Sequence, residues 1–215
     1  MKSETKKELL NTVQEFMNSD IYKEQEKLLE ERSKTLKSGA DVIHLTYLGH
    51  QLEDSDLKEI EEILKKENLQ LSSYNKSGII YNLIDDYTLT TFFVISYQIY
   101  QLLNEVKSNA LWDILKYVIL KTWNKINTRT HIANEKIKFG ITVNLDEKTR
   151  INVQIEGSEK LASETLDKVL TYLKTQERNT DKKMFPDYIN YDEKKGAFVK
   201  IDVANKIRKK ANRNS

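Results

Sequence analysis

The feature that most constrains the fold is a pair of alternating segments between residues 137 and 155. In both segments every second residue is apolar, and the residues between are polar or glycine. The apolar residues are Ile137, Phe139, Ile141, Val143 and Leu145 in the first segment and Ile151, Val153 and Ile155 in the second. A period of two is typical of strands with one buried face, and the polar run 146–149 favours a turn. The pattern predicts an antiparallel hairpin whose second, polar face lies toward water or a partner.

A strand, a helix and a second strand are predicted upstream of this hairpin. Residues 41–48 are rich in β-branched and aromatic side chains and precede Gly49, which is typical of a strand that ends in a turn. Residues 54–64 repeat apolar side chains on one helical face, and residues 68–74 favour another strand. The three elements fit within about 35 residues, which suits a βαβ unit of roughly that size.

The centre of the chain is its most apolar part. Residues 87–104 contain no charged side chain, and residues 111–126 are apolar on most faces. We interpret the two stretches as buried helices joined near residue 108. A membrane span needs about 20 apolar residues. Several Thr, Ser and Gln residues dilute the first stretch, and Asp113, Lys116 and Lys121 interrupt the second, so we expect core helices and no membrane insertion.

The order of elements defines the expected fold class. A helix over residues 157–176 follows the hairpin, and a charged helical arm precedes the first strand. We expect an α+β fold: a mainly antiparallel, four-stranded sheet of split-βαβ type, packed against helices and preceded by an N-terminal helical arm. The expected divisions are an arm over 1–38, a core domain over 39–177, and an extension over 178–215 with a second hairpin near 188–202 and a basic tail.

Composition excludes several classes of protein. The chain has 215 residues and no cysteine, which rules out disulfide frameworks, thiolate metal sites and cysteine nucleophiles. Its 35 Lys and Arg residues against 33 Asp and Glu residues give a net charge of +2, well below that of a chain built wholly to coat nucleic acid. The charged N-terminus lacks the apolar core of a signal peptide, so we expect a cytoplasmic protein. Abundant Lys, Asn and Ile favour a bacterial or phage origin.

Candidate catalytic and metal-binding groups are few. His44 and His50 could share a metal ion, but six residues of strand span about 20 Å, which is too far without a bend. Asp187 and Asp192, followed by Glu193 and Lys194, partly match a metal-dependent nuclease pattern, yet these acids are too close in sequence for neighbouring strands. The pair Asp85–Asp86 is better explained as a helix cap. We therefore predict no catalytic, cofactor-binding or metal site.

Two segments are candidates for binding. The arm carries a thin apolar stripe that includes Leu28 and Leu29, which favours contact with a partner. The tail from residue 203 to 215 has no acidic residue and five basic ones, so the rest of the chain carries a net −3. The basic residues are Lys206, Arg208, Lys209, Lys210 and Arg213. Such a tail could contact phosphates or an anionic protein, or simply be solvated.

These observations rank three functional hypotheses. The first is a non-enzymatic binding or regulatory protein that acts through a protein partner or self-association, which the chain's 11 Tyr residues also favour. The second is nucleic-acid binding through the basic tail. The third is a hydrolase or nuclease whose motif is not recognised.

Overall fold

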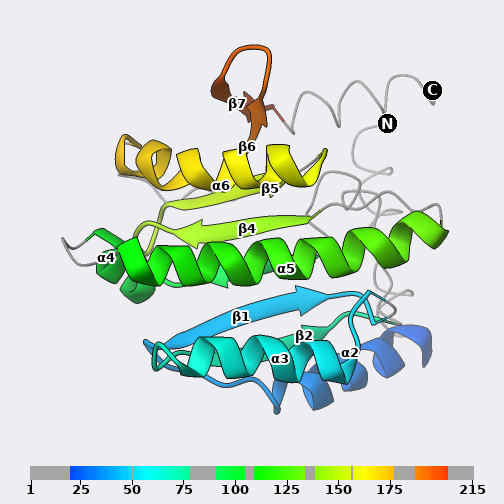
Figure 1. Cartoon of the computed structure of the whole chain (residues 1–215). Helices are drawn as coiled ribbons and strands as arrows, with labels where there is room; N and C mark the ends of the chain where they lie inside the picture. Colours follow the sequence, from blue (N-terminus) through cyan, green and yellow to red (C-terminus); the bar gives the residue numbers. More distant parts are fainter. Residues whose placement is uncertain are drawn as a thin grey trace, which may run out of the picture.

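A computed structural model describes residues 20–49, 51–77, 91–104, 109–133, 139–155, 157–176 and 187–202. The helices are α2 (Asp20–Ser33), α3 (Asp54–Lys65), α4 (Tyr97–Asn104), α5 (Asn109–Ala133) and α6 (Glu159–Lys174). The strands are β1 (Val42–Tyr47), β2 (Gln70–Asn75), β3 (Thr91–Ile95), β4 (Phe139–Asn144), β5 (Arg150–Ile155), β6 (Asp187–Asp192) and β7 (Ala197–Ile201). Figure 1 shows these elements.

The strands form one seven-stranded sheet in the order β2-β1-β3-β4-β5-β6-β7. Parallel and antiparallel pairs alternate along it: β1–β2, β3–β4 and β5–β6 are parallel, and β1–β3, β4–β5 and β6–β7 are antiparallel. Each parallel pair is joined through one or two helices, as parallel strands require. The expectation of a four-stranded, mainly antiparallel sheet was therefore wrong, although the fold is α+β.

The apolar face of the sheet is covered by helices. The register places Leu45 opposite Phe93, Phe93 opposite Ile141 and Ile141 opposite Val153, so these side chains share one face. All four are at most 1% exposed and lie in one core with residues of α3, α5 and α6. Figure 1 shows these three helices side by side in front of the sheet. The predicted hairpin is confirmed as β4–β5, because its apolar residues face this core.

The opposite face of the sheet is polar, and we call it the polar face. One row of paired residues crosses it from β2 to β6: Ser72, His44, Val94, Thr142, Asn152 and Tyr188. The Thr142 hydroxyl donates to Asn152 Oδ1 at 2.8 Å. Four of the six are buried, with His44 and Val94 half-buried. The row is therefore mainly hydroxyl, imidazole and amide groups, interrupted by Val94 on β3.

The third helical crossover has the opposite hand to the first two. Helix α6 packs against α5, and its Tyr172 ring contacts Phe198 on the apolar face, so α6 lies on the same face as α3 and α5. The unit β5–α6–β6 advances across the sheet in the same direction as β3–α5–β4, but its strands run the other way. About 98% of such crossovers are right-handed. Because this sheet contains crossovers of both hands, it includes the rare left-handed form.

The uncharged stretch 87–104 does not form one helix, as the sequence had led us to expect. Residues Thr91–Ile95 form β3 and Tyr97–Asn104 form α4, whereas 87–90 lie outside the described residues. A short apolar run bounded by polar residues fits a buried strand and a buried helix equally well by periodicity. Among the described helices, none combines the length and apolar character that crossing a bilayer requires.

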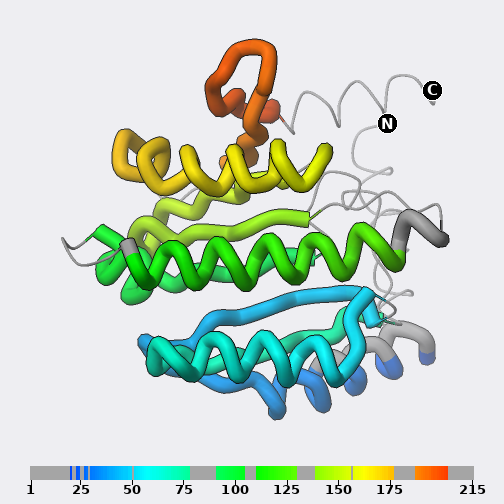
Figure 2. The backbone as a smooth tube through the Cα atoms, in the orientation of Figure 1, coloured from blue at the N-terminus to red at the C-terminus, as the bar shows by residue number. Residues whose placement is uncertain are grey.

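The predicted βαβ unit at the start of the sheet is confirmed. It is formed by β1, α3 and β2, with β1 and β2 parallel and in register from Val42 with Gln70 to Tyr47 with Asn75. The backbone trace in Figure 2 places this unit at one end of the sheet and the β6–β7 hairpin at the other. Helix α2 lies beside β2. The domain boundaries at residues 38 and 177 remain predictions.

Candidate functional site

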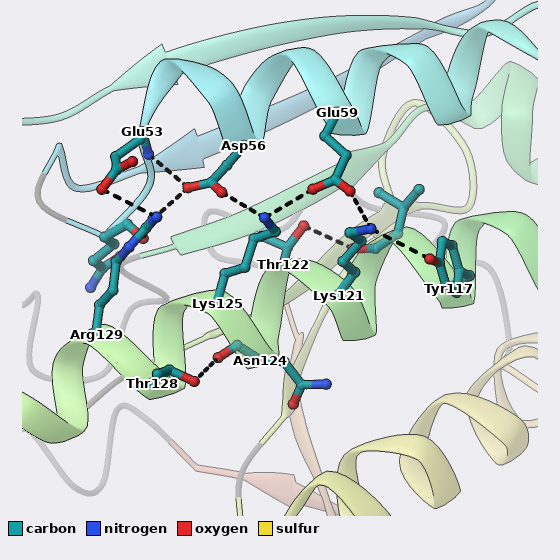
Figure 3. Close-up of polar contacts among 12 residues, drawn as sticks. Glu53, Asp56, Glu59, Tyr117, Lys121, Thr122, Asn124, Lys125, Thr128 and Arg129 are labelled. Atoms are coloured by element: carbon teal, nitrogen blue, oxygen red, sulfur yellow. Dashed lines mark hydrogen bonds and ion pairs between the residues drawn. The ribbon is translucent and has the colours of Figure 1, made fainter.

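The largest charged cluster among the described residues joins α3 to α5, and we call it the α3–α5 network (Figure 3). Its members are Glu53, Asp56, Glu59, Tyr117, Lys121, Lys125 and Arg129. Asp56 is the centre, because its side chain is only 4% exposed and both of its oxygens bind a cation. Oδ1 lies 2.7 Å from Lys125 Nζ, and Oδ2 pairs with Arg129. Oδ2 also accepts the backbone N–H of Glu53 at 2.9 Å.

The network continues outward from Lys125. Lys125 Nζ lies 2.9 Å from Glu59 Oε2, and Lys121 Nζ lies 2.5 Å from Glu59 Oε1. Lys121 also donates to the Tyr117 hydroxyl at 3.4 Å. At the other end, Arg129 Nη2 lies 3.3 Å from Glu53 Oε1. Positive and negative groups thus alternate along the groove between the two helices.

Helical spacing explains how the sequence builds the network. Glu53 is the N-cap of α3, and with Asp56 three residues later it forms a capping box. Glu59 follows after another three residues and so lies near the same helical face. On α5, Lys121, Lys125 and Arg129 are each four residues apart, which makes one basic stripe. The two stripes meet because α3 and α5 pack side by side.

The contacts of the network favour the charged forms of Asp56 and Lys125. Burial alone would raise the pKa of Asp56, but hydrogen bonds from Arg129, Lys125 and the Glu53 amide outweigh it and lower that pKa to about 2. Hydrogen bonds from Asp56 and Glu59 raise the pKa of Lys125. A carboxylate held ionised and paired is a poor general acid or base at pH 7. The network therefore joins the two helices through paired charges.

The lowered pKa of Asp56 predicts an acid-sensitive contribution to stability. A carboxyl group whose pKa falls from 3.8 to about 2 on folding stabilises the protein fully above about pH 5 and loses this effect as the pH falls through 4 toward 2. The loss corresponds to about 2 kcal/mol. Urea unfolding of wild type and Asp56→Asn at pH 6 and pH 2.5 measures it: wild type should lose about 2 kcal/mol more than the variant. Parallel curves would contradict this assignment.

A second polar cluster holds the β6–β7 hairpin against α6. Lys168 Nζ lies 2.6 Å from Glu164 Oε1 and 4.4 Å from the centre of the Tyr191 ring. The Tyr191 hydroxyl donates to Glu164 Oε1 at 3.1 Å. Beside it, the Phe198 ring lies 4.7 Å from Tyr172 and 5.4 Å from Tyr191, measured between ring centres. These contacts hold the hairpin rigidly at the end of the sheet.

The two edges of the sheet differ in what lies beside them. At the β2 edge, Arg32 Nη1 donates to the carbonyl of Asn75 at 2.6 Å, and the amide of Lys37 donates to Ser72 Oγ at 3.0 Å. At the other end, the sheet order stops at β7 within the described part of the chain. Its residues are exposed or half-exposed, and Figure 1 shows the hairpin extending beyond α6. The β7 edge is therefore a candidate binding surface.

Two open pockets lie elsewhere. One, of about 320 Å³, lies between α3, β2 and the segment after α2 and is lined partly by Lys37, Lys58 and Glu61; the Lys37 and Glu61 side chains form an ion pair at 3.0 Å. The other, of about 330 Å³, is lined partly by Tyr100 and Lys174. Within the described residues, no group of three or more His, Asp or Glu side chains could hold a metal ion.

The residues proposed from sequence are placed as follows. Leu28 lies on α2 and is half-buried, and Leu29 lies on the same helix, but its side chain is outside the described part. All five basic tail residues, His50 and the Asp85–Asp86 pair lie outside the described residues. The nucleic-acid hypothesis therefore remains a prediction, as do the expected origin and cellular location.

His44 and the acidic residues of the nuclease pattern are described. His44 lies on the polar face between Ser72 and Val94, where burial lowers the pKa of its imidazole. Asp187 and Asp192 lie at opposite ends of β6 and, being five residues apart, on opposite faces of the sheet. Asp187 pairs with Lys200 at 2.9 Å, and Asp192 with Lys195 at 3.6 Å. The structure does not bring the two carboxylates together.

Comparison of the chain with protein-family models, with curated proteins and with solved structures found no match.

Proposed function

We propose that the chain is a non-enzymatic binding protein whose working surface is the outer edge of β7. An edge strand presents N–H and C=O groups that can pair with another extended segment, and strand addition of this kind is a common mode of recognition. The observation that carries the proposal is the position of β7 at the end of the sheet order and beyond the helical layer.

The contrast with β2 supports this choice of edge. Backbone and side-chain groups near β2 already bind Arg32 and Lys37, which come from α2 and the segment after it. On β7, the side chain of Lys200 turns back to Asp187 on β6, and Phe198 packs on Tyr172 of α6. These contacts fix the strand from its inner side, so a partner would meet a pre-ordered edge and would not need to order it. Such pre-organisation lowers the cost of binding.

The described titratable groups support a binding role over a catalytic one. Asp56, the most buried carboxylate with a shifted pKa, has three hydrogen-bond donors and two cationic partners. Glu164 and Lys168, beside the hairpin, are paired with each other and with Tyr191. Catalytic acids and bases need a free position toward a substrate. These groups are instead used to hold elements together.

A pair of proline substitutions tests the proposed edge. Neighbouring residues of a strand point their N–H groups in opposite directions, so one of Val199→Pro and Lys200→Pro removes an N–H that pairs with β6 and the other removes one on the outer edge. The variant that loses an N–H paired with β6 should be destabilised. The variant that loses an N–H on the outer edge should melt within about 2 °C of wild type, since its loss lies outside the sheet, but should no longer bind extended segments.

The binding probe is a display library of short random segments selected on the wild-type protein. The segments that are selected should bind wild type and should lose binding to the stable proline variant. Ser73→Pro on β2, at the far edge, is the matched control: the N–H groups of Gln70 and Lys76 donate toward β1, so that of Ser73 points outward, and its loss should leave their binding unchanged. If no segment is selected, or if selected segments bind both edge variants equally, β7 is not the binding surface.

A further inference from the structure

We infer that the segment paired with β7 is β7 of a second copy of this chain, antiparallel and related by a two-fold axis that passes beside Val199. This inference rests on the proposed use of the β7 edge and names its partner. The evidence for it is the order of side chains along β7, which matches the order along a second, antiparallel copy of the same strand.

The register follows from the symmetry. If Val199 faces Val199 of the second copy, then Phe198 faces Lys200, and Ala197 faces Ile201. Ala197, Val199 and Ile201 share the polar face of the sheet because they pair with Asp192, Asn190 and Tyr188 of β6. Every pair on this side of the new contact is apolar. Directly opposed apolar side chains are the pairs that stabilise antiparallel strands.

The other side of the strand pairs an aromatic ring with a cation. Phe198 and Lys200 lie on the helix-covered face, since they pair with Tyr191 and Ile189. Lys200 Nζ is held 2.9 Å from Asp187, and its side chain remains 63% exposed. In the antiparallel pair, Lys200 of one copy lies opposite Phe198 of the other. A lysine beside an aromatic ring is favourable, whereas a parallel pair would not place these two residues opposite each other.

Charge complementarity extends beyond the strand ends. The same symmetry places Gly196 opposite residue 202, so the turn that carries Lys194 and Lys195 lies beside Asp202 of the second copy. Lys194, Lys195 and Asp202 are all exposed. The turn also contains Glu193 and follows Asp192, so it is Lys194 and Lys195 that oppose Asp202 in charge, and because the contact is two-fold this meeting occurs twice. Such complementarity selects one partner and one orientation.

The shape of the molecule permits the contact. A two-fold axis between antiparallel strands of one sheet stands perpendicular to that sheet, so the helices of both copies lie on the same face. Figure 1 shows the β6–β7 hairpin extending beyond α6, so none of the described helices covers the outer edge of β7. A contact of one short strand buries little surface, so the dimer should form reversibly with concentration.

Light scattering over a concentration series tests the inference on the full chain. The mass of wild type should rise from 25.2 kDa toward twice that value. Val199→Lys places like charges opposite each other at the axis and should keep the protein monomeric at every concentration at which wild type is dimeric. Its melting temperature should be unchanged, since Val199 is half-exposed. Gln70→Lys, an exposed position on the other edge strand, is the control and should still dimerise.

A charge exchange tests the orientation. The variant Lys194→Glu with Lys195→Glu and the variant Asp202→Lys should each be monomeric, because the first sets acidic side chains at 194 and 195 against Asp202 and the second sets a lysine at 202 against Lys194 and Lys195. An equimolar mixture should form a heterodimer, because both contacts then join opposite charges. Absence of dimer in the mixture, or dimer in either variant alone, overturns the antiparallel pairing.

The outcomes separate this inference from the proposed function. A wild-type chain that stays monomeric but binds selected segments at β7 overturns self-pairing and leaves the binding edge in place. A monomer that binds no segment overturns both. A dimer that persists in Val199→Lys shows association through another surface and overturns the inference.

Discussion

Val143→Asp is expected to destabilise the fold by about 4 kcal/mol, because it buries a charge that has no partner. Val143 lies on β4, in the middle of the sheet, and is 1% exposed beneath the helical layer. Urea unfolding should show the loss as a lower midpoint with an unchanged slope. The variant should also be recovered in lower yield, since a loss of this size is a large part of the stability of a typical domain.

Asn144→Asp is the matched control for Val143→Asp. The next residue of the strand points to the polar face, and its Oδ1 already accepts from Arg150 Nε at 3.1 Å. A carboxylate there keeps that contact and gains a charge opposite to that of the guanidinium, so stability should stay within about 0.5 kcal/mol of wild type. Equal midpoints for the two variants would contradict the assignment of faces in the β4–β5 hairpin.

Asp56→Asn is expected to cost about 3 kcal/mol at pH 7, the second-largest effect. Removing one partner of a buried ion pair leaves the opposite charges uncompensated. Lys125 and Arg129 are 28% and 29% exposed, so water can reach them and the cost should fall at the low end of the usual range. The amide retains an oxygen for the Glu53 N–H, so the cap of α3 should persist. Thermal and urea unfolding measure the loss.

Glu59→Gln is the control from the same network. Its carboxylate is 41% exposed, and water screens exposed ion pairs, so this variant should lose much less stability than Asp56→Asn. Arg129→Met alone and combined with Asp56→Asn completes a double-mutant cycle, and we expect a coupling of at least about 1 kcal/mol between the two positions. Additive effects would mean that Arg129 and Asp56 do not stabilise each other.

The sequence was most informative where one strand face is buried and the other polar. Residues 137–155 alternate apart from the turn, and the hairpin and its core-facing side were predicted correctly, whereas Thr142 and Asn152 on the other side, expected to face water or a partner, are 5% and 9% exposed. The unit β1–α3–β2 was also predicted, because Gly49 and the capping residues before α3 mark its boundaries. The hairpin at 187–201 was predicted from the turn around Gly196, which has a positive φ of 62° that favours glycine.

The number of strands could not be predicted for two physical reasons. Thr91–Ile95 lies within a stretch that is apolar on both sides, so it shows no period of its own. Its Thr91, Val94 and Ile95 are β-branched, which is the one local signal that favours a strand. The pairing of β6 with β5 is parallel and depends on a crossover through α6. Nothing local to residues 187–192 specifies such a long-range neighbour.

The α3–α5 network was missed for a related reason. The acidic positions at 53, 56 and 59 and the basic positions at 121, 125 and 129 are visible in the sequence as two stripes. Each stripe alone fits an exposed helical face, and nothing in either indicates that the two helices pack together. The β7 edge was not proposed as a site either, because an edge exists only once the strand order is known.

The strand order has a consequence for how the chain can fold during its synthesis. From β4 onward, every strand pairs with the strand made just before it, and β1 with β3 is the one pair among the described strands that skips a strand. The sheet can therefore grow by adding each new strand to the same edge as the ribosome releases it. No strand has to insert between two strands that are already paired. At each stage of synthesis the most recent strand is an edge strand with one side unpaired. This edge strand is first β3, then β4, and so on until β7 is added.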